Sequence, residues 1–265
     1  MGKTNIPWAN KSWNPAHGCT ERSTGCRNCY ARTWAESRLR GVGTYPADEP
    51  FRVVCDPYKL GDPLHWRKPA KVFPVSMGDW LHHEIPLRYS MAMLGVAGTA
   101  ERHRFLFLTK RQDRLEELRL ALGDDPAEAA KLCFAAAVEH LPSAVHRDDV
   151  YRASNDVFEN CAASRFAFPF SNVLQGVTTE RQFEAALRLD VLLRFPAAAR
   201  FVSVEPMLGA VVPKLARKVC ESCGTTVITD NPSGHSGPGQ ETDPARSSVF
   251  CRVCGMSMPS AARID

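Results

Sequence analysis

Three cysteines lie close together near the start of the chain, in the segment GCTERSTGCRNCYA at residues 18–31. A disulfide uses two thiols, and a closed structural zinc site uses four ligands. Three thiolates can instead hold three irons of a four-iron four-sulfur cluster and leave the fourth iron open for an exchangeable ligand. The spacing of Cys19, Cys26 and Cys29 therefore favours such a cluster. A zinc site completed by His17 and a set of unliganded thiols are the alternatives.

Four more cysteines form two C-x-x-C-G pairs towards the end of the sequence. Two such pairs can close a tetrahedral four-sulfur zinc site, and the glycine after each pair allows a tight turn. The 27 residues between Cys223 and Cys251 are rich in Gly, Pro and Ser, which is typical of a flexible excursion. We therefore predict a zinc ribbon over residues 213–265, with unliganded cysteines as the alternative. Its zinc ligands would be Cys220, Cys223, Cys251 and Cys254.

The composition is that of a globular chain with a mildly basic balance. It has 265 residues, 44% of them hydrophobic, which is enough to bury a sizeable core. No run approaches the roughly 18 apolar residues of a membrane helix, and the first residues lack the apolar core of a signal peptide. We therefore expect a cytoplasmic protein without a membrane partner. The net charge of +4 permits a nucleic-acid partner without requiring one.

The remaining three of the ten cysteines stand alone in the sequence. In a reducing cytoplasm, cysteines are more often ligands or buried thiols than members of a disulfide framework. Free cysteine is also among the most buried residue types. We therefore expect small buried side chains at Cys55, Cys133 and Cys161.

Short apolar runs rich in β-forming residues alternate with helical patterns along the chain. The apolar runs cover residues 71–79, 104–111, 172–180 and 199–206. The helical patterns between them cover residues 85–100, 112–122 and 181–195. This alternation predicts a parallel α/β sheet or barrel. Residues 122–170 break the rhythm, with an Ala-rich helix followed by loop-like sequence, which we interpret as a helical insertion between two barrel units.

Polar residues follow each of the four apolar runs. In a parallel α/β barrel, functional groups gather where strands end and loops begin, so these residues are candidates for the wall of a site. Each of them taken alone is equally consistent with an ordinary polar loop residue or a helix cap. Carboxylates here could accept hydrogen bonds from an amino group or ribose hydroxyls, and cations could hold a carboxylate or phosphate. The residues are Ser76, Gly78 and Asp79; Thr109, Lys110 and Arg111; Thr178, Thr179 and Glu180; and Ser203 and Glu205.

Several blocks of the sequence carry a family resemblance. They are SWNPAHGCTERSTGCRNCYA, DPLHWRKPAKVFPVSMGDWLHHEIP, FLFLTKRQDRL and NVLQGVTTERQFEAALRLDVLLRFPAAARFVSVEPMLGAV. Over roughly residues 5 to 212, the chain resembles the phage-associated three-Cys-motif family, which is radical-SAM-like and largely of unknown function. The resemblance implies an α/β fold with a partial parallel (β/α) barrel of radical SAM type, related to the TIM barrel, over residues 1–212. The zinc ribbon would be its C-terminal appendage.

The resemblance also implies a chemistry. A four-iron four-sulfur cluster on the three clustered cysteines would bind the amino and carboxylate groups of S-adenosylmethionine (SAM). One electron from a donor would then cleave the sulfonium to methionine and a 5′-deoxyadenosyl radical, which abstracts hydrogen from a substrate. The SMGD segment at 76–79 falls where radical SAM enzymes bind the methionine amino group. The SAM-binding residues would be Tyr30, Ser76, Gly78, Asp79, Thr109, Lys110, Glu180, Ser203 and Glu205.

Two features depart from the general radical SAM pattern. The usual spacing is C-x3-C-x2-C with an aromatic residue just before the last cysteine. Here the first gap is six residues, Asn28 holds the aromatic position and Tyr30 follows the motif. The chain also passes from SVEPMLG into the zinc pairs rather than into a further strand with a Gly-rich turn, which predicts a barrel short of its last strand.

Two functions follow as expectations. The first is a radical SAM enzyme that modifies or repairs a macromolecule, with nucleic acid favoured by the basic balance, the zinc ribbon and the phage association. The second is a metal-bearing nucleic-acid-binding or scaffold protein that has lost radical chemistry. The basic segment RTWAESRLR at residues 32–40 would contact nucleic acid in either case, or would be an exposed helix face.

Overall fold

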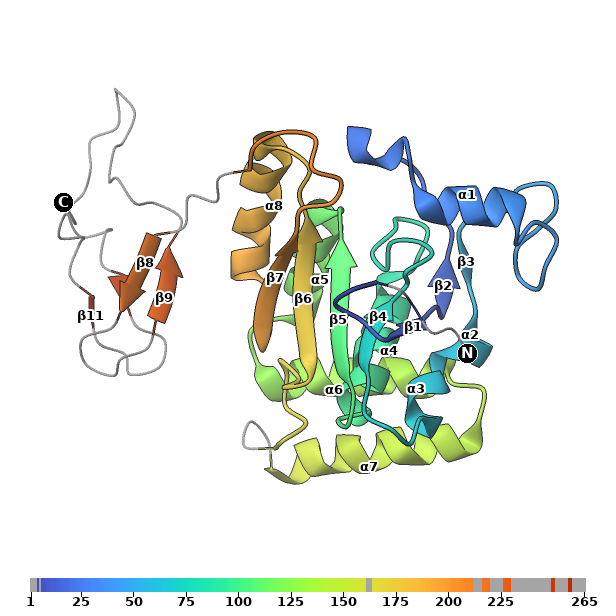
Figure 1. Ribbon diagram of the computed structural model, residues 1–265. Coiled ribbons are helices and arrows are strands. Elements are labelled where there is room, and N and C mark those ends of the chain that lie inside the picture. Colours follow the sequence, from blue (N-terminus) through green and yellow to red (C-terminus); the bar gives the residue numbers. More distant parts are fainter. Residues whose placement is uncertain are drawn as a thin grey trace. The chain divides into compact units, whose positions relative to one another are not determined.

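The structure of the protein is a computed structural model that describes residue 4, residues 6–160 and 164–211, and four short strands beyond residue 215 (Figure 1). The chain divides into two compact units, Met1–Val211 and Val212–Asp265. No helix among the described residues has the length and apolar character needed to cross a bilayer.

A five-stranded parallel sheet forms the centre of the first unit. Its strands are β1 (Lys11–Trp13), β4 (Lys71–Pro74), β5 (Arg104–Thr109), β6 (Val173–Thr178) and β7 (Ala199–Ser203). The order in the sheet is β1-β4-β5-β6-β7 and every neighbouring pair is parallel. The predicted parallel α/β sheet is confirmed. Within the described residues the sheet is open, with β1 and β7 at its edges.

The helices that follow the sheet strands lie where the sequence predicted them. They are α4 (Leu87–Thr99) after β4, α5 (Gln112–Leu122) after β5 and α8 (Gln182–Arg194) after β6. Each strand therefore pairs with the next sheet strand in sequence after a helical crossover. This succession never reverses direction along the sheet, unlike the strand order of a doubly wound fold.

Two further helices stand between α5 and β6. The Ala-rich segment forms α6 (Pro126–His140), whose Asp125 cap accepts hydrogen bonds from two backbone N–H groups of the first turn. The loop-like interpretation of the following sequence is wrong, because residues Ala144–Asn160 form a second helix, α7. Val150, Ala153 and Val157 are all buried in this helix. Their spacing of three and four residues is a helical stripe that the surrounding charged residues obscured.

The remaining elements are short. Two of them, the 3-10 turn η1 and the helix α1, lie within and just after the clustered cysteines. The elements are β2 (Ala16–His17), η1 (Thr24–Cys26), α1 (Tyr30–Ser37), β3 (Val54–Cys55), α2 (Pro57–Leu60) and α3 (Asp62–His65). Strands β2 and β3 pair with each other in antiparallel fashion outside the main sheet.

The core lies between one face of the sheet and the helices α4 and α6. In β5, Phe105 and Phe107 are fully buried, whereas the alternate residues Leu106 and Leu108 are half-buried. This two-residue period shows that only one face of the strand meets the main core. Asn172 fastens the loop before β5, since its side-chain N–H₂ donates to the carbonyls of Ala97, Ala100 and His103.

The three cysteines that stand alone in the sequence differ in how far the structure bears out their predicted burial. Cys133 is fully buried among apolar side chains, as predicted, and Cys55 is partly buried against the same core. Burial also raises the pKa of the Cys133 thiol. Cys161 lies outside the described residues.

The second unit is described through four strands. Strand β8 (Ala216–Val219) pairs antiparallel with β9 (Thr226–Thr229), and β10 (Val249–Phe250) pairs antiparallel with β11 (Ser257–Met258). In the sequence, one C-x-x-C pair falls between β8 and β9, and the other falls between β10 and β11. The four predicted zinc ligands, Cys220, Cys223, Cys251 and Cys254, lie outside the described residues.

Packing of α4 on α6 generates a prediction about stability. A Cβ atom added to Gly95 of α4 would lie 2.3 Å from the backbone oxygen of Cys133 in α6. We expect Gly95→Ala to lower the free energy of unfolding by about 1–3 kcal/mol, the usual cost of overpacking a core. Urea denaturation followed by circular dichroism measures this free energy. Gly209→Ala is the matched control, since its Cβ would meet only Arg181 at 3.7 Å, and an equal effect of the two changes would contradict the packing argument.

Candidate functional site

The cysteine loop, residues 18–30, is attached to the segment that follows β4. The backbone N–H of Gly18 donates to the Met77 carbonyl at 2.9 Å, and Gly18 forms a parallel bridge with Gly78. At the other end of the loop, the Tyr30 hydroxyl donates to the Ser76 carbonyl. The loop is therefore fixed to the carboxyl end of β4 on both sides of the three cysteines.

Two glycines allow close packing around the start of the cysteine loop. Gly18 has a φ of +83°, and a Cβ atom there would lie 1.9 Å from the Arg52 carbonyl oxygen. A Cβ atom on Gly78 would lie 2.6 Å from the Gly18 carbonyl oxygen. Gly78, expected to be a SAM-binding residue, thus serves a packing contact that sets the position of the residue before Cys19.

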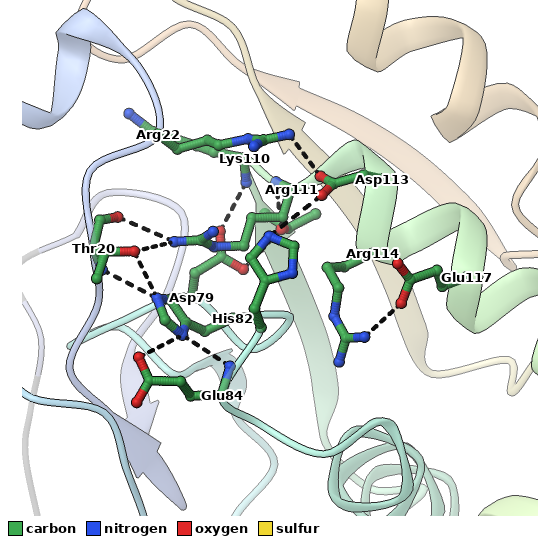
Figure 2. Close-up of polar contacts among 12 residues, drawn as sticks. Thr20, Arg22, Asp79, His82, Glu84, Lys110, Arg111, Asp113, Arg114 and Glu117 are labelled. Carbon is green, nitrogen blue, oxygen red and sulfur yellow. Dashed lines mark hydrogen bonds and ion pairs between the residues drawn. The ribbon is translucent and has the colours of Figure 1, made fainter.

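Thr20 is held by two buried side chains, Arg111 and His82 (Figure 2). The Arg111 guanidinium donates through Nη2 to the Thr20 carbonyl and hydroxyl oxygens, both at 3.1 Å. His82 Nε2 accepts from the Thr20 backbone N–H at 3.2 Å and lies 2.8 Å from its hydroxyl. Burial lowers the pKa of His82 to about 4, and the charge of Arg111 adds to the shift. The neutral ring can therefore accept these hydrogen bonds near pH 7.

Asp79 links the end of β4 to the end of β5. Its Oδ1 accepts from the Thr109 hydroxyl at 2.7 Å and the Leu81 N–H at 3.1 Å, and its Oδ2 accepts from the Lys110 N–H at 2.9 Å. The Thr109 hydroxyl in turn accepts from the N–H of Arg111 at 2.9 Å. Both oxygens of Asp79 are thus occupied by groups of the protein itself.

Glu180, just beyond β6, is the buried carboxylate that joins the cysteine loop to the sheet. Its side chain is 0% exposed. Oε1 accepts from the Ser23 hydroxyl at 2.7 Å and pairs with Lys110 Nζ at 2.5 Å, and Oε2 pairs with Arg188 Nη1 at 2.7 Å. Burial alone would raise the pKa of Glu180, but the hydrogen bonds from Lys110 and Ser23 and the charges of Lys110 and Arg188 lower it. A Cβ atom on Gly25 would lie 2.7 Å from the Glu180 side chain.

A more exposed ion pair attaches the outer part of the loop. Arg22 Nη2 lies 2.8 Å from Asp113 Oδ1 in α5, and His83 Nε2 lies 3.4 Å from the other oxygen of Asp113 (Figure 2). All three side chains are about one-third to one-half exposed. Such a pair contributes little free energy because solvent screens it. The part-buried contacts of Thr20 and Ser23 with buried partners therefore fix the loop.

The three thiols differ in their surroundings. Burial raises the pKa of Cys19 to about 11, with Asp79 adding to the shift and Arg111 opposing it, and Arg111 Nη2 lies 3.7 Å from the Cys19 sulfur. At Cys26, burial opposes ionisation, but hydrogen bonds from Arg22 and Ser23 outweigh it and lower the pKa. The Arg22 N–H donates to the Cys26 sulfur at 3.4 Å. Donors aimed at thiolate sulfurs fit cluster ligands, whose potentials depend on such hydrogen bonds.

The zinc alternative with His17 finds no support in this arrangement. His17 Nε2 lies 2.8 Å from the Thr44 hydroxyl, and its ring stacks on Tyr45 at 4.0 Å between centroids. Among the residues that the structure describes, no group of three or more His, Cys, Asp or Glu side chains is arranged to hold a metal ion, and this holds for the three cysteines of the loop as well.

The SAM-binding residues expected from the sequence lie at the same edge of the sheet but have different environments. Ser76 donates to Asn14 Oδ1 at 3.2 Å, and the carbonyl of buried Ser203 accepts from the N–H of Thr179 at 2.8 Å. Glu205 is exposed. Their role towards SAM stays a prediction. The geometry adds His82 and Ser23, whose partners lie 62 and 157 positions away in the sequence, and Arg188, which reads in the sequence as an ordinary charged residue of a helix.

A cleft of about 490 Å³ reaches Cys19 from the side of α1. Charged side chains of both signs line it, with Arg32, Glu36 and Arg40 from α1 and the residues just after it, and Glu49 and Arg52 from the loop before β3. The cleft gives a ligand a route to the first cysteine.

One comparison with known proteins gives a match. A family model matches residues 3–242, and its description is "Protein of unknown function (DUF5131)". The chain therefore belongs to the DUF5131 family. No curated protein and no solved structure matches the chain.

The Glu180 contacts predict a large effect of a small substitution. Glu180→Gln leaves Lys110 and Arg188 without their buried counter-charge, and we expect the free energy of unfolding to fall by about 3–5 kcal/mol. Glu205→Gln alters an exposed carboxylate at the same edge of the sheet, so it should change stability by less than about 0.5 kcal/mol. Urea denaturation of both variants measures the difference, and similar values for the two would remove Glu180 from its linking role.

His82 predicts a pH dependence. Its folded pKa of about 4 lies below the ordinary 6.5, so the unfolded chain binds a proton between these values that the folded chain does not. Stability therefore falls as pH drops from 6.5 towards 4. Between pH 7 and pH 5, His82→Gln should remove about 2 kcal/mol of the wild-type loss. Denaturation curves at both pH values test this, and parallel losses in the two proteins would show that His82 already titrates normally.

Proposed function

We propose that this chain is a radical SAM enzyme whose four-iron four-sulfur cluster is held by Cys19, Cys26 and Cys29. The observation that supports this most is the attachment of the cysteine loop to the carboxyl ends of β4, β5 and β6. In parallel α/β folds, ligands bind at the carboxyl ends of the strands. The unreversed order of the strands also fits a partial barrel of radical SAM type.

The chemistry supplied at this position would be transfer of one electron from an external donor to the sulfonium of SAM. The products would be methionine and, after hydrogen abstraction from the substrate, 5′-deoxyadenosine. The protein's own contribution is to hold the three thiols on a fixed loop. Arg111 and the Arg22 backbone donate towards the sulfurs of Cys19 and Cys26. At Cys26 the donors lower the pKa and favour the thiolate form that ligates metal, whereas at Cys19 the Arg111 donor only partly opposes the rise in pKa caused by burial.

The contacts divide the strand-end residues into two groups. Asp79, Thr109, Lys110 and Glu180 bond to one another or to the cysteine loop, so we assign them a positioning role. The exposed Glu205 remains for direct contact with SAM, with its carboxylate accepting from an amino group or ribose hydroxyls. Tyr30 of α1 could offer only its half-exposed ring, since its hydroxyl donates to the Ser76 carbonyl.

The second unit would be a zinc ribbon that helps to bind a macromolecular substrate. Antiparallel pairs β8–β9 and β10–β11 flank the two C-x-x-C pairs in sequence, which is the arrangement of zinc knuckles. Nucleic acid is the favoured substrate because of the basic balance of the chain. The phage association of the resembled family points the same way.

The alternative function is a metal-bearing nucleic-acid-binding or scaffold protein without radical chemistry. The six-residue gap between Cys19 and Cys26, and Asn28 in place of an aromatic residue, favour it. The internal partners of Asp79 and Lys110 favour it as well, because these groups are then not available to SAM.

One experiment separates the two functions. The full chain is reconstituted anaerobically with iron and sulfide, reduced with dithionite and incubated with SAM. Formation of 5′-deoxyadenosine, measured by liquid chromatography, supports the radical enzyme. Protein that retains iron and sulfide but forms none of this product would be assigned to the binding function.

The two cysteine groups should hold different metals and separate by mutation. Cys26→Ala or Cys29→Ala should abolish iron and acid-labile sulfide binding, while about one zinc per chain remains at the single four-ligand site. Cys220→Ala or Cys254→Ala should release zinc and leave iron and sulfide in place. Metal and sulfide analysis of the anaerobically purified proteins measures both. Loss of zinc in the first pair, together with wild-type protein that takes up no iron, would end the radical SAM proposal.

A further inference from the structure

The amino ends of the sheet strands, opposite the carboxyl ends that meet the cysteine loop, carry a concentration of positive charge. We define the basic patch as Arg67, Lys68, Lys71, Arg102 and Arg104, all of which are exposed. Lys71 and Arg104 are the first residues of β4 and β5, so they lie at the amino ends of strands whose carboxyl ends meet the cysteine loop (Figure 1). The five charges of the patch exceed the net charge of +4 of the whole chain.

The two strand residues are held side by side. Lys71 and Arg104 are register partners in the parallel pairing of β4 with β5. The Arg104 N–H donates to the Ala70 carbonyl at 2.9 Å, and Asn10 bonds both backbone groups of Lys71 at 2.9 Å. Like charges on directly paired strand residues disfavour folding, so this arrangement has a cost in the free protein that a bound anion would remove.

The carboxylates near the patch do not neutralise it. A cavity of about 500 Å³ is lined by Lys71, Arg102 and Arg104, and Glu101 is the one acidic residue in its wall. Glu101 pairs at 3.7 Å with Arg165, which lies outside the patch. Within the described part of the chain, neither Lys71 nor Arg104 has a carboxylate within 4.0 Å. The wall of the cavity is therefore a preformed cationic surface.

The patch extends beyond this cavity along the surface. Arg102 Nη1 donates to the Trp66 carbonyl at 3.4 Å, which brings the loop that carries Arg67 and Lys68 next to the cavity. Neighbouring strands lie about 4.8 Å apart, so Lys71 and Arg104 can approach one phosphate together while the other cations approach adjacent ones. A single small anion would leave part of this charge unmatched.

We propose that the basic patch binds the sugar–phosphate backbone of nucleic acid, independently of base sequence. Contacts of Lys and Arg with phosphates supply sequence-independent affinity and orient the bound strand. The site needs neither the cluster nor radical chemistry, so it holds whether or not the proposed enzymatic activity is correct. It would anchor the nucleic acid at the edge of the sheet opposite the three cysteines.

Fluorescence anisotropy of the full chain with a labelled single-stranded DNA of about 20 nucleotides tests the proposal, because single-strand sites commonly cover about 4–16 nucleotides. Removing two phosphate contacts with Lys71→Gln and Arg104→Gln together should weaken binding about 25-fold at about 0.1 M salt and lower the salt slope by about 1.4. The thermal midpoint should stay unchanged or rise, since a like-charge contact is removed.

The matched control carries Arg181→Gln and Arg194→Gln, which remove the same charge from exposed positions at the two ends of α8. It should bind DNA as the wild type does. Equal losses of DNA affinity in the two double variants would show that only the net charge of the chain matters, and would overturn the proposal. Loss in the control alone would move the interface to α8 and overturn the proposal. Absence of DNA binding, with or without capture of phosphatidylserine vesicles, would also overturn it.

Discussion

The buried carboxylate of Glu180 is the interaction on which the arrangement of this site depends. It accepts from Ser23 of the cysteine loop, from Lys110 beyond β5 and from Arg188 of α8. A carboxylate with no exposed surface is tolerated only when charges and hydrogen bonds compensate its lost hydration. The loop, the sheet and one covering helix must therefore adopt their positions together. The position of the cysteine loop is therefore set by the need to compensate the buried charge of Glu180.

Much of the scaffold could be predicted from the sequence because its signals are local. The run that forms β5 and the amphipathic pattern of α5 are periodic and closed by polar residues, so their existence follows from short-range patterning. Strand β1 was missed because three residues carry no period. Helix α7 was missed because its stripe of Val150, Ala153 and Val157 is narrow and its other positions are polar.

The candidate site was harder to predict than the scaffold. The sequence correctly predicted that Asp79, Lys110 and Glu180 lie close together, since parallel strands bring their carboxyl ends to the same end of the sheet. The sequence could not indicate that these groups would engage one another. The pairing of Asp79 with Thr109 spans 30 positions, and that of Ser23 with Glu180 spans 157. Such partners depend on tertiary geometry, which residue type and spacing do not encode.

The contact between Gly18 and Gly78 has a consequence for how a cofactor would enter. Many small metal sites acquire their shape only when the metal binds, so that binding and folding are one event. Here two glycine backbones in contact and the buried partners of Thr20 already order the loop. The conformational entropy of the loop is lost when the chain folds. A cofactor would then meet a loop whose ends are already fixed. The reorganisation left to it would be to bring the three thiols together, since no three of the described His, Cys, Asp or Glu side chains are grouped to hold a metal ion.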